Sequence, residues 1–144
     1  MPTGYKGGMT ASELKSRVRE YIERVWNDKD VDALDTLSSE SYRRHLGPGE
    51  ASLDRAAQKE RLRKLQRALP DVRFHVDDLI AEGDRVVFRV TVTGTHRGEM
   101  LGVPATGRAV AFSAIDILRF EAGKVVEHWG FGDGAALLRQ LGKL

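Results

Sequence analysis

An acid and an imidazole near the end of the chain, Asp116 and His128, are the residues whose types and spacing best suit proton transfer. Between them lies a turn that we expect to be a three-residue loop over residues 121–123, with its final glycine in the left-handed conformation. This loop pairs Phe120 with Lys124. Counting outward along both strands then places Asp116 opposite His128 on one face of the sheet. A two-residue turn would place the two side chains on opposite faces.

The face shared by the acid and the imidazole is otherwise mostly apolar. Desolvation in such a place raises the pKa of a carboxyl group, whereas pairing with an imidazole lowers it, so either residue could be the base. The alternative is that the two side chains only satisfy each other's hydrogen bonds inside the sheet. Neighbouring positions on the same face form the expected wall of a substrate-binding cavity: Phe112, Ala114, Leu118 and Gly130.

Helices come first among the elements that must position this hairpin. Thr10 and Glu13 form a capping-box pattern, and apolar residues then recur at helical spacing as far as Trp26. A short second helix is expected over residues 31–37. A third is expected from about residue 53 to residue 69, directly before Pro70.

Strands follow from residue 72, where the apolar period changes from helical toward two. Two hairpins are expected, over residues 72–92 and 109–130, joined by a glycine-rich loop over residues 97–107, and Asp133 could cap a short final helix. Helices followed by an antiparallel meander predict an α+β fold with a curved antiparallel sheet. We expect a single domain over residues 10–144, preceded by a flexible leader over residues 1–9.

The last third of the chain also resembles a known family. The resemblance rests on Gly94-Thr95-His96, on GEMLGVPATGR from Gly98 to Arg108, on SAIDILRF ending at Phe120, and on EHWGFGDGAALLRQLG ending at Gly142. Together these segments resemble the SnoaL-like polyketide cyclases of the nuclear transport factor 2-like superfamily. The resemblance implies a cone-shaped half-barrel, in which the curved sheet wraps around three N-terminal helices and encloses a deep apolar pocket. It also implies ring closure without a cofactor.

The chain departs from this family at two positions. In the best-known ring-closing members a histidine stands where this chain has Asp116, and the acid-base aspartate stands where it has Gly130. We therefore expect either that Asp116 has taken over proton transfer, with His128 as its partner, or that the protein acts mainly by folding its substrate. Gly130 is expected to enlarge the pocket and make it more apolar.

Five further residues are candidates for substrate binding. Trp26 and Tyr42 follow the apolar positions of the first two helices and are expected in the core or the cavity wall. The resemblance places His45 at the pocket mouth, with an exposed loop position as the alternative. Met100 and Leu101 either cover the pocket entrance or anchor their glycine-rich loop.

Composition excludes several classes of site. The 144 residues include no cysteine and carry a formal net charge of only +2, with acids and bases interleaved. The basic run from Lys59 to Arg67 is expected to be a solvated helix face, so nucleic acid is not an expected partner. No apolar run is long enough for a membrane span, and no motif for a metal or a nucleotide is present. We expect a cytoplasmic protein without metal or cofactor.

The sequence predicts a cofactor-independent enzyme that closes a ring within a polyketide-like intermediate in natural-product biosynthesis, such as that of an antibiotic. The closure would be an aldol-type or cycloaddition-type reaction of the isomerase or lyase kind. The alternatives are a non-catalytic domain that binds a hydrophobic small molecule, and an epoxide hydrolase or hydratase of the same superfamily. The expected partners are a hydrophobic substrate and a second copy of the chain, bound through the outer face of the sheet.

Overall fold

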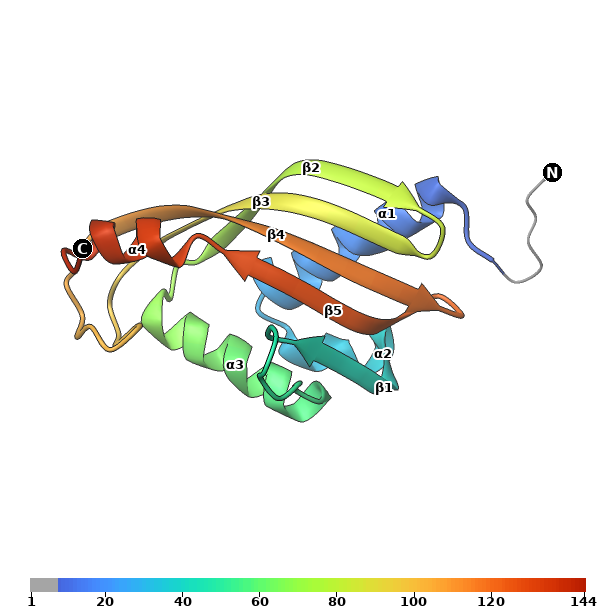
Figure 1. Ribbon diagram of the computed structural model, residues 1–144, viewed down its shortest axis with the longest axis horizontal. Coiled ribbons are helices and arrows are strands. Elements are labelled where there is room, and N and C mark those ends of the chain that lie inside the picture. The colour runs from blue at the N-terminus through green and yellow to red at the C-terminus, as the bar shows by residue number, and fades with distance from the viewer. Residues whose placement is uncertain (1–7) are drawn as a thin grey trace.

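The computed structural model describes residues 8–144, and the leader predicted for residues 1–9 lies outside this range except for Gly8 and Met9. Helices precede most of the strands along the chain (Figure 1). In order, the elements are α1 (Ala11–Tyr21), the π-helix η1 (Ile22–Asn27), the 3-10 helix η2 (Val31–Ala33), α2 (Leu34–Leu37), β1 (Ser38–His45), α3 (Arg55–Ala68), β2 (Arg73–Glu82), β3 (Arg85–Thr95), β4 (Ala109–Glu121), β5 (Lys124–Gly132) and α4 (Gly134–Gln140).

Side-chain hydrogen bonds hold both ends of the continuous helical segment formed by α1 and η1. The Thr10 hydroxyl accepts from the Glu13 amide at 3.1 Å, and the Glu13 carboxylate accepts from the Thr10 amide at 2.8 Å, which confirms the predicted capping box. At the other end, the Asn27 side chain bonds both the amide and the carbonyl of Phe74 in β2. The helix is therefore fastened to the sheet just after Trp26.

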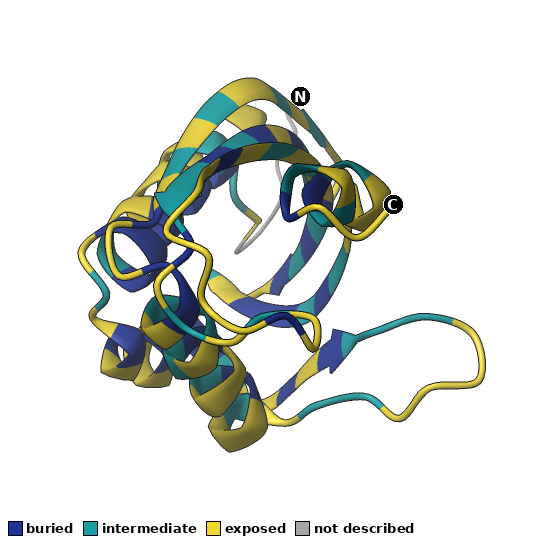
Figure 2. Cartoon of the chain, turned by 90° about the vertical axis from the view of Figure 1, so that its left-hand side faces the viewer, coloured by how far each residue is buried: buried dark blue, intermediate teal, exposed yellow. Residues whose placement is uncertain are grey.

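The sheet has the strand order β1-β5-β4-β3-β2 and is antiparallel except where β1 runs parallel to β5. It curls around α1 and α3, and buried positions alternate with exposed ones along its strands (Figure 2). The predicted α+β class and the half-barrel are confirmed. No strand was predicted at Ser38–His45, because this segment holds one large apolar residue, Tyr42, and lacks the apolar alternation of the other strands.

The β4–β5 hairpin differs from its prediction in a way that matters for the site. Its turn has two residues, Ala122 and Gly123, with φ of 50° and 77°, and Glu121 pairs with Lys124. The predicted three-residue loop is wrong. A register shift between Arg119 and Phe120 then adds one residue to β5, so that Asp116 pairs with Gly130 and Leu118 pairs with His128. Because of this bulge, Asp116 and His128 still face the same side.

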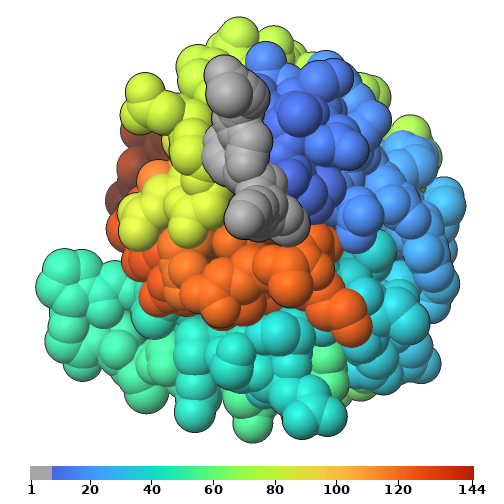
Figure 3. Space-filling model, turned by 90° about the vertical axis from the view of Figure 1, so that its right-hand side faces the viewer, coloured from blue at the N-terminus to red at the C-terminus, as the bar shows by residue number. Residues whose placement is uncertain are grey.

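The concave side of the sheet forms the core with the helices. Inward residues of β3 and β4 are buried against those of α1 and η1, among them Val18, Val25, Phe88, Val90 and Leu118. At the end of the molecule shown in Figure 3, the turns of the two hairpins lie beside the start of α1. There Arg17 donates to the Gly123 carbonyl at 2.9 Å. Within residues 8–144, no helix combines the length and apolar character needed to span a bilayer.

Candidate active site

A cavity of about 510 Å³ lies between the concave face of the sheet, α3 and the loop over residues 96–108. This volume falls within the range of small-molecule sites. Most of its wall is apolar, and includes Trp26, Leu62, Phe74, Val90, Val92 and Phe112. Asp116 and Arg44 place opposite charges in this wall where β4, β5 and β1 lie side by side. Further polar side chains line the cavity elsewhere: Gln58, Arg61, Lys64 and Glu99.

Asp116 belongs to a buried polar network. Its Oδ2 lies 2.5 Å from Nε2 of His128, a fully buried ring, and 3.5 Å from Nη1 of Arg44. On the other side of the ring, the Tyr42 hydroxyl lies 3.2 Å from Nδ1 of His128. The network therefore joins β1, β4 and β5 through four side chains.

The position of Arg44 explains how one imidazole can contact two charged groups. Nη1 of Arg44 is 2.7 Å from Nε2 and 3.2 Å from Nδ1 of His128. The two ring nitrogens flank Cε1, so an atom this close to both lies over the face of the ring rather than in its plane. The in-plane directions of both nitrogens remain for Asp116 and Tyr42.

Burial sets the protonation of the network. Desolvation lowers the pKa of His128 from 6.5 to about 4, and the positive charge of Arg44 acts in the same direction, so the ring is neutral at neutral pH. A neutral ring has one N–H, and the short contact to Asp116 requires that it be on Nε2. Burial also raises the pKa of Tyr42, so its hydroxyl keeps its proton and donates to Nδ1. Arg44 supplies the charge opposite the Asp116 carboxylate.

Gly130 makes room for this arrangement. It is the direct cross-strand partner of Asp116, and a Cβ at residue 130 would lie 2.8 Å from Asp116 Cγ and 2.9 Å from Arg44 Nη2. The carboxylate and guanidinium fill the volume that a side chain at residue 130 would need. Gly130 is absent from the cavity lining, so the expectation that it enlarges the pocket is wrong.

The structure distributes the other predicted site residues between the cavity and its surroundings. Trp26, Met100, Leu101, Phe112 and Ala114 line the cavity together with Asp116. The side chains of Tyr42, His128 and Leu118 are buried and do not contribute to the cavity lining.

His45 lies on the convex face, and its predicted place at the pocket mouth is wrong. Its Nε2 is 2.9 Å from Glu127, and its ring stacks on Trp129 at 5.1 Å. The reason is that β1 continues through this residue, so that Arg44 faces inward and His45 faces outward.

Several residues in the cavity wall were not predicted. Arg44 follows Tyr42 by two positions and shares its face, a pattern that becomes visible only once β1 is recognised as a strand. On α3, Gln58 and Arg61 share the helical spacing of Leu62 and Leu65, and these residues line the cavity with Lys64. Arg61 and Lys64 are exposed, as predicted for the run from Lys59 to Arg67, and they also border the cavity.

Three buried polar atoms of wall residues have no hydrogen-bond partner among residues 8–144. They are Nε1 of Trp26, Nε of Arg44 and Oε1 of Gln58. Buried polar atoms are nearly always paired, so these two donors and one acceptor are exceptions among the wall residues.

The loop over residues 96–108 forms the rim of the cavity. The amides of Arg97 and Gly98 both donate to the carbonyl of Ala68, at 2.9 and 3.2 Å, which fixes the loop to the end of α3. Beyond this anchor, Met100 and Leu101 extend along the cavity edge, and Leu101 has a left-handed φ of 52°. Within the part of the chain that the structure describes, no group of three His, Asp or Glu side chains is placed to hold a metal.

Comparison with known proteins gives a family for this fold and site. A model of the SnoaL-like polyketide cyclases matches residues 16–141. Aklanonic acid methyl ester cyclase DnrD from Streptomyces peucetius is 32% identical over 71 residues, which cover 48% of this chain and 49% of the relative. The aligned region thus spans about half the length of the curated relatives that it matches.

Two solved structures match nearly the whole chain. AclR, a candidate hydroxylase from Streptomyces galilaeus, is 34% identical with a TM-score of 0.84, over 94% of this chain and 99% of that one. IdmH, a candidate polyketide cyclase from Streptomyces antibioticus, is 30% identical with a TM-score of 0.77, over 89% and 98%. The chain belongs to the SnoaL-like polyketide cyclase family.

The close packing of side chains around Gly130 can be tested by substituting two glycines of β5 separately. We expect Gly130→Ala to lower the free energy of unfolding by about 1–3 kcal/mol, because its methyl group displaces Asp116 and Arg44. Gly132→Ala is the matched control, since a Cβ there meets Phe112 only at 3.8 Å. Urea unfolding of both variants measures the difference. Equal stability of the two variants would contradict the packing described here.

The low pKa of His128 predicts how stability depends on pH. Between the unfolded value near 6.5 and the folded value of about 4, the unfolded chain binds a proton that the folded protein does not. This contribution to stability is complete above pH 6.5 and is lost as the pH falls toward 4. We expect His128→Gln to flatten the slope in this window, measured by urea unfolding at several pH values. The exposed His75→Gln control should keep the wild-type slope, and an unchanged slope in His128→Gln would refute the assignment.

Proposed function

We propose that the protein is a cofactor-independent enzyme that closes a ring within a polyketide-like molecule held in the cavity. The observation that carries the proposal is the Asp116 carboxylate in the wall of a largely apolar cavity, bonded to a neutral His128 and paired with Arg44. Family membership and the named activity of the curated relatives support it. A cytoplasmic location, expected from the sequence, belongs to the same proposal.

Asp116 acts as the base in this mechanism. Its Oδ2 faces His128 and Arg44, while Oδ1 has no hydrogen-bond partner within residues 8–144 and is available to a substrate. The carboxylate takes a proton from a carbon between two carbonyl groups, and the resulting enolate carbon attacks a carbonyl of the same molecule. The new alkoxide then recovers the proton from Asp116. Atoms are conserved, and no external oxidant or reductant takes part.

The other members of the network stabilise and position the base. Arg44 places a positive charge beside the negative charge that moves from Asp116 to the enolate and on to the alkoxide. His128 stays neutral and holds Asp116 through its Nε2–H, while Tyr42 fixes the tautomer. Because the network is buried, its charges act with little screening by water.

The shape of the cavity contributes separately from proton transfer. Apolar side chains from α3, β3 and β4 surround the volume and can hold a flexible chain with its two ends together. Such restriction contributes up to about 7–11 kcal/mol in ideal cases, more than a single acid or base provides. A cycloaddition would need only this restriction.

Hydroxylation is a second candidate function, favoured by the likeness to AclR over nearly the whole chain. The two reactions differ in mass balance. Ring closure by an aldol addition or a cycloaddition leaves the mass of the substrate unchanged, whereas hydroxylation adds one oxygen atom and needs dioxygen and a reductant. Addition of water would add an oxygen and two hydrogens. Mass spectrometry of the product therefore separates these possibilities.

Aklanonic acid methyl ester, the compound named for the curated relatives, is the first substrate to test. We expect the wild type to convert it without change of mass and Asp116→Asn to lower the rate by about 10²- to 10⁴-fold, because the amide cannot accept the proton. Asp28→Asn, an exposed site outside the cavity, serves as the control and should keep the wild-type rate. An undiminished rate in Asp116→Asn would remove proton transfer from the mechanism.

We also propose that the protein is a homodimer that joins through the convex face of the sheet. Cross-strand pairs align apolar residues across this face: Ile80 with Val87, Val87 with Ile117, Ile117 with Trp129, and Ile115 with Phe131. Ile80 and Phe131 are more than 60% exposed. The nearby charges are paired among themselves, as in Arg89 with Asp78 and Arg119 with Glu127, so a second copy could cover the apolar band without leaving charges unpaired.

The dimer is tested by placing a charge in the apolar band. We expect size-exclusion chromatography with light scattering to give a dimer for the wild type and a monomer for Ile115→Glu, since the carboxylate would be buried without a partner. Ala56→Glu, on the exposed side of α3, should remain dimeric. A monomeric wild type would refute the proposal.

A further inference from the structure

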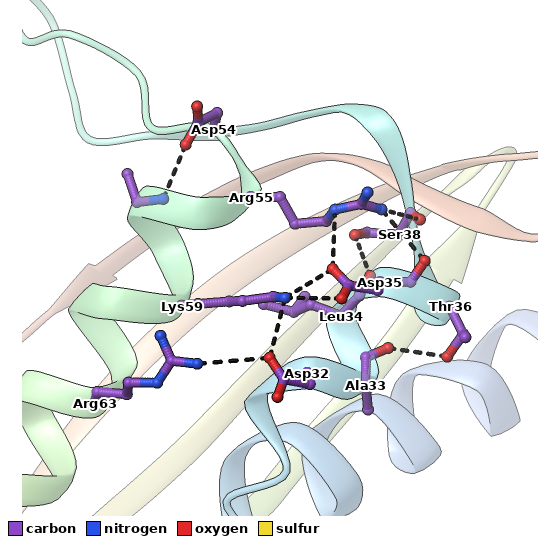
Figure 4. A network of polar contacts seen from close by, with 11 residues as sticks. Asp32, Ala33, Leu34, Asp35, Thr36, Ser38, Asp54, Arg55, Lys59 and Arg63 are labelled. Carbon is purple, nitrogen blue, oxygen red and sulfur yellow. Dashed lines mark hydrogen bonds and ion pairs between the residues drawn. The ribbon is translucent and has the colours of Figure 1, made fainter.

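Most basic side chains of α3 are paired with acids on its outer side. Lys59 lies 2.8 Å from Asp35 and 3.1 Å from Asp32, and Arg63 lies 3.5 Å from Asp32 (Figure 4). Arg55 also reaches Asp35, at 3.4 Å, and Arg67 pairs with Glu60 at 3.1 Å. All four cations are balanced by carboxylates, and three of them fasten the helix to η2 and α2: Arg55, Lys59 and Arg63.

Arg61 and Lys64 differ from their neighbours on α3. They lie one turn apart and both line the cavity. Within residues 8–144, no carboxylate lies within 4.0 Å of either side chain. Partial burial lowers the pKa of Arg61, and the nearby positive charge of Arg44 acts in the same direction. The cavity side of α3 therefore carries two exposed cations that form no ion pair with the described chain, although the charge of Asp116 acts on Arg61 from a greater distance.

The acids of the cavity wall have other partners. Asp116 is held by His128 and Arg44. Glu99, on the rim loop, accepts a hydrogen bond from the Gly102 amide at 2.7 Å. Two positive charges without a paired counter-ion at the border of a largely apolar cavity attract an anionic group from a ligand that enters it.

We propose that Arg61 and Lys64 bind a carboxylate of the substrate, so that the protein prefers free acids to the corresponding neutral esters. A guanidinium binds both oxygens of a carboxylate in a planar fork, and the ammonium adds a second charge one helical turn away. The bound carboxylate fixes which end of an otherwise apolar molecule lies against α3. This preference would distinguish the chain from the curated relatives, which are named for a methyl ester. The inference rests on the proposed function only in taking the cavity as the substrate site.

A carboxylic acid and its methyl ester can be compared to measure how the negative charge of the ligand affects its affinity. Anthraquinone-2-carboxylic acid and its methyl ester share one apolar ring system, and isothermal titration calorimetry measures the affinity of the protein for each. We expect the wild type to bind the acid about tenfold more tightly than the ester, as fits one charge-assisted contact. The difference should shrink as salt is raised.

Variants on the two sides of α3 show which basic residues cause the preference for the acid. We expect the double variant Arg61→Gln/Lys64→Gln to bind acid and ester with equal affinity. Arg63→Gln/Arg67→Gln removes the same charge from the solvent side of the helix and should keep the preference for the acid. Urea unfolding of both double variants confirms that each is folded.

The possible results separate the inference from the proposed function. Equal affinity of the wild type for acid and ester overturns the inference and leaves the cavity as the substrate site. An equal loss of preference in both double variants also overturns it, because net charge rather than the cavity cations would then be responsible. If neither compound binds, the result counts against the proposed function, and the inference falls with it.

Discussion

A carboxylate buried in an apolar wall is unstable unless its neighbours compensate for the water that it has lost, and the site depends on how this is done for Asp116. Compensation comes from three strands. β1 contributes Arg44, β5 contributes His128 and, at Gly130, the lack of a side chain that leaves room for the network, and β4 contributes the acid itself. The parallel pairing of β1 with β5 sets Arg44 directly beside His128. Removing either Asp116 or Arg44 would leave the other charge buried without its partner.

The same burial determines the chemistry of the network. It keeps His128 neutral, so that the ring donates one hydrogen bond to Asp116 and does not compete with Arg44 for the role of counter-ion. The resemblance to the family implies that its acid-base aspartate corresponds to Gly130 of this chain. Here the carboxylate of Asp116 enters the same volume from the neighbouring strand, because residues 116 and 130 are direct cross-strand partners. An acid therefore faces the cavity from a different position in the chain.

The sequence was sufficient to predict the helices and the long strands, because their apolar periods are regular. It was also sufficient to predict that Asp116 and His128 lie on the same face of the sheet. The face was right although the turn was wrong, because a two-residue turn followed by a one-residue bulge preserves the same alternation as a three-residue loop. Arg44 and the place of His45 could not be predicted in the same way. β1 consists mainly of polar and charged residues, and its pairing depends on a partner more than eighty residues away. The place of Arg61 and Lys64 in the cavity lining could not be predicted, because charge and helical spacing alone do not show which side of α3 faces a cavity.

The claim on which the account depends is that a neutral His128, protonated on Nε2, supports an ionised Asp116. Nitrogen NMR of the histidine rings tests it directly, with His128 assigned by the loss of its signals in His128→Gln. The account predicts that at neutral pH Nε2 of His128 carries a proton and Nδ1 does not. An imidazolium with protons on both nitrogens, or a ring protonated on Nδ1 alone, would contradict it.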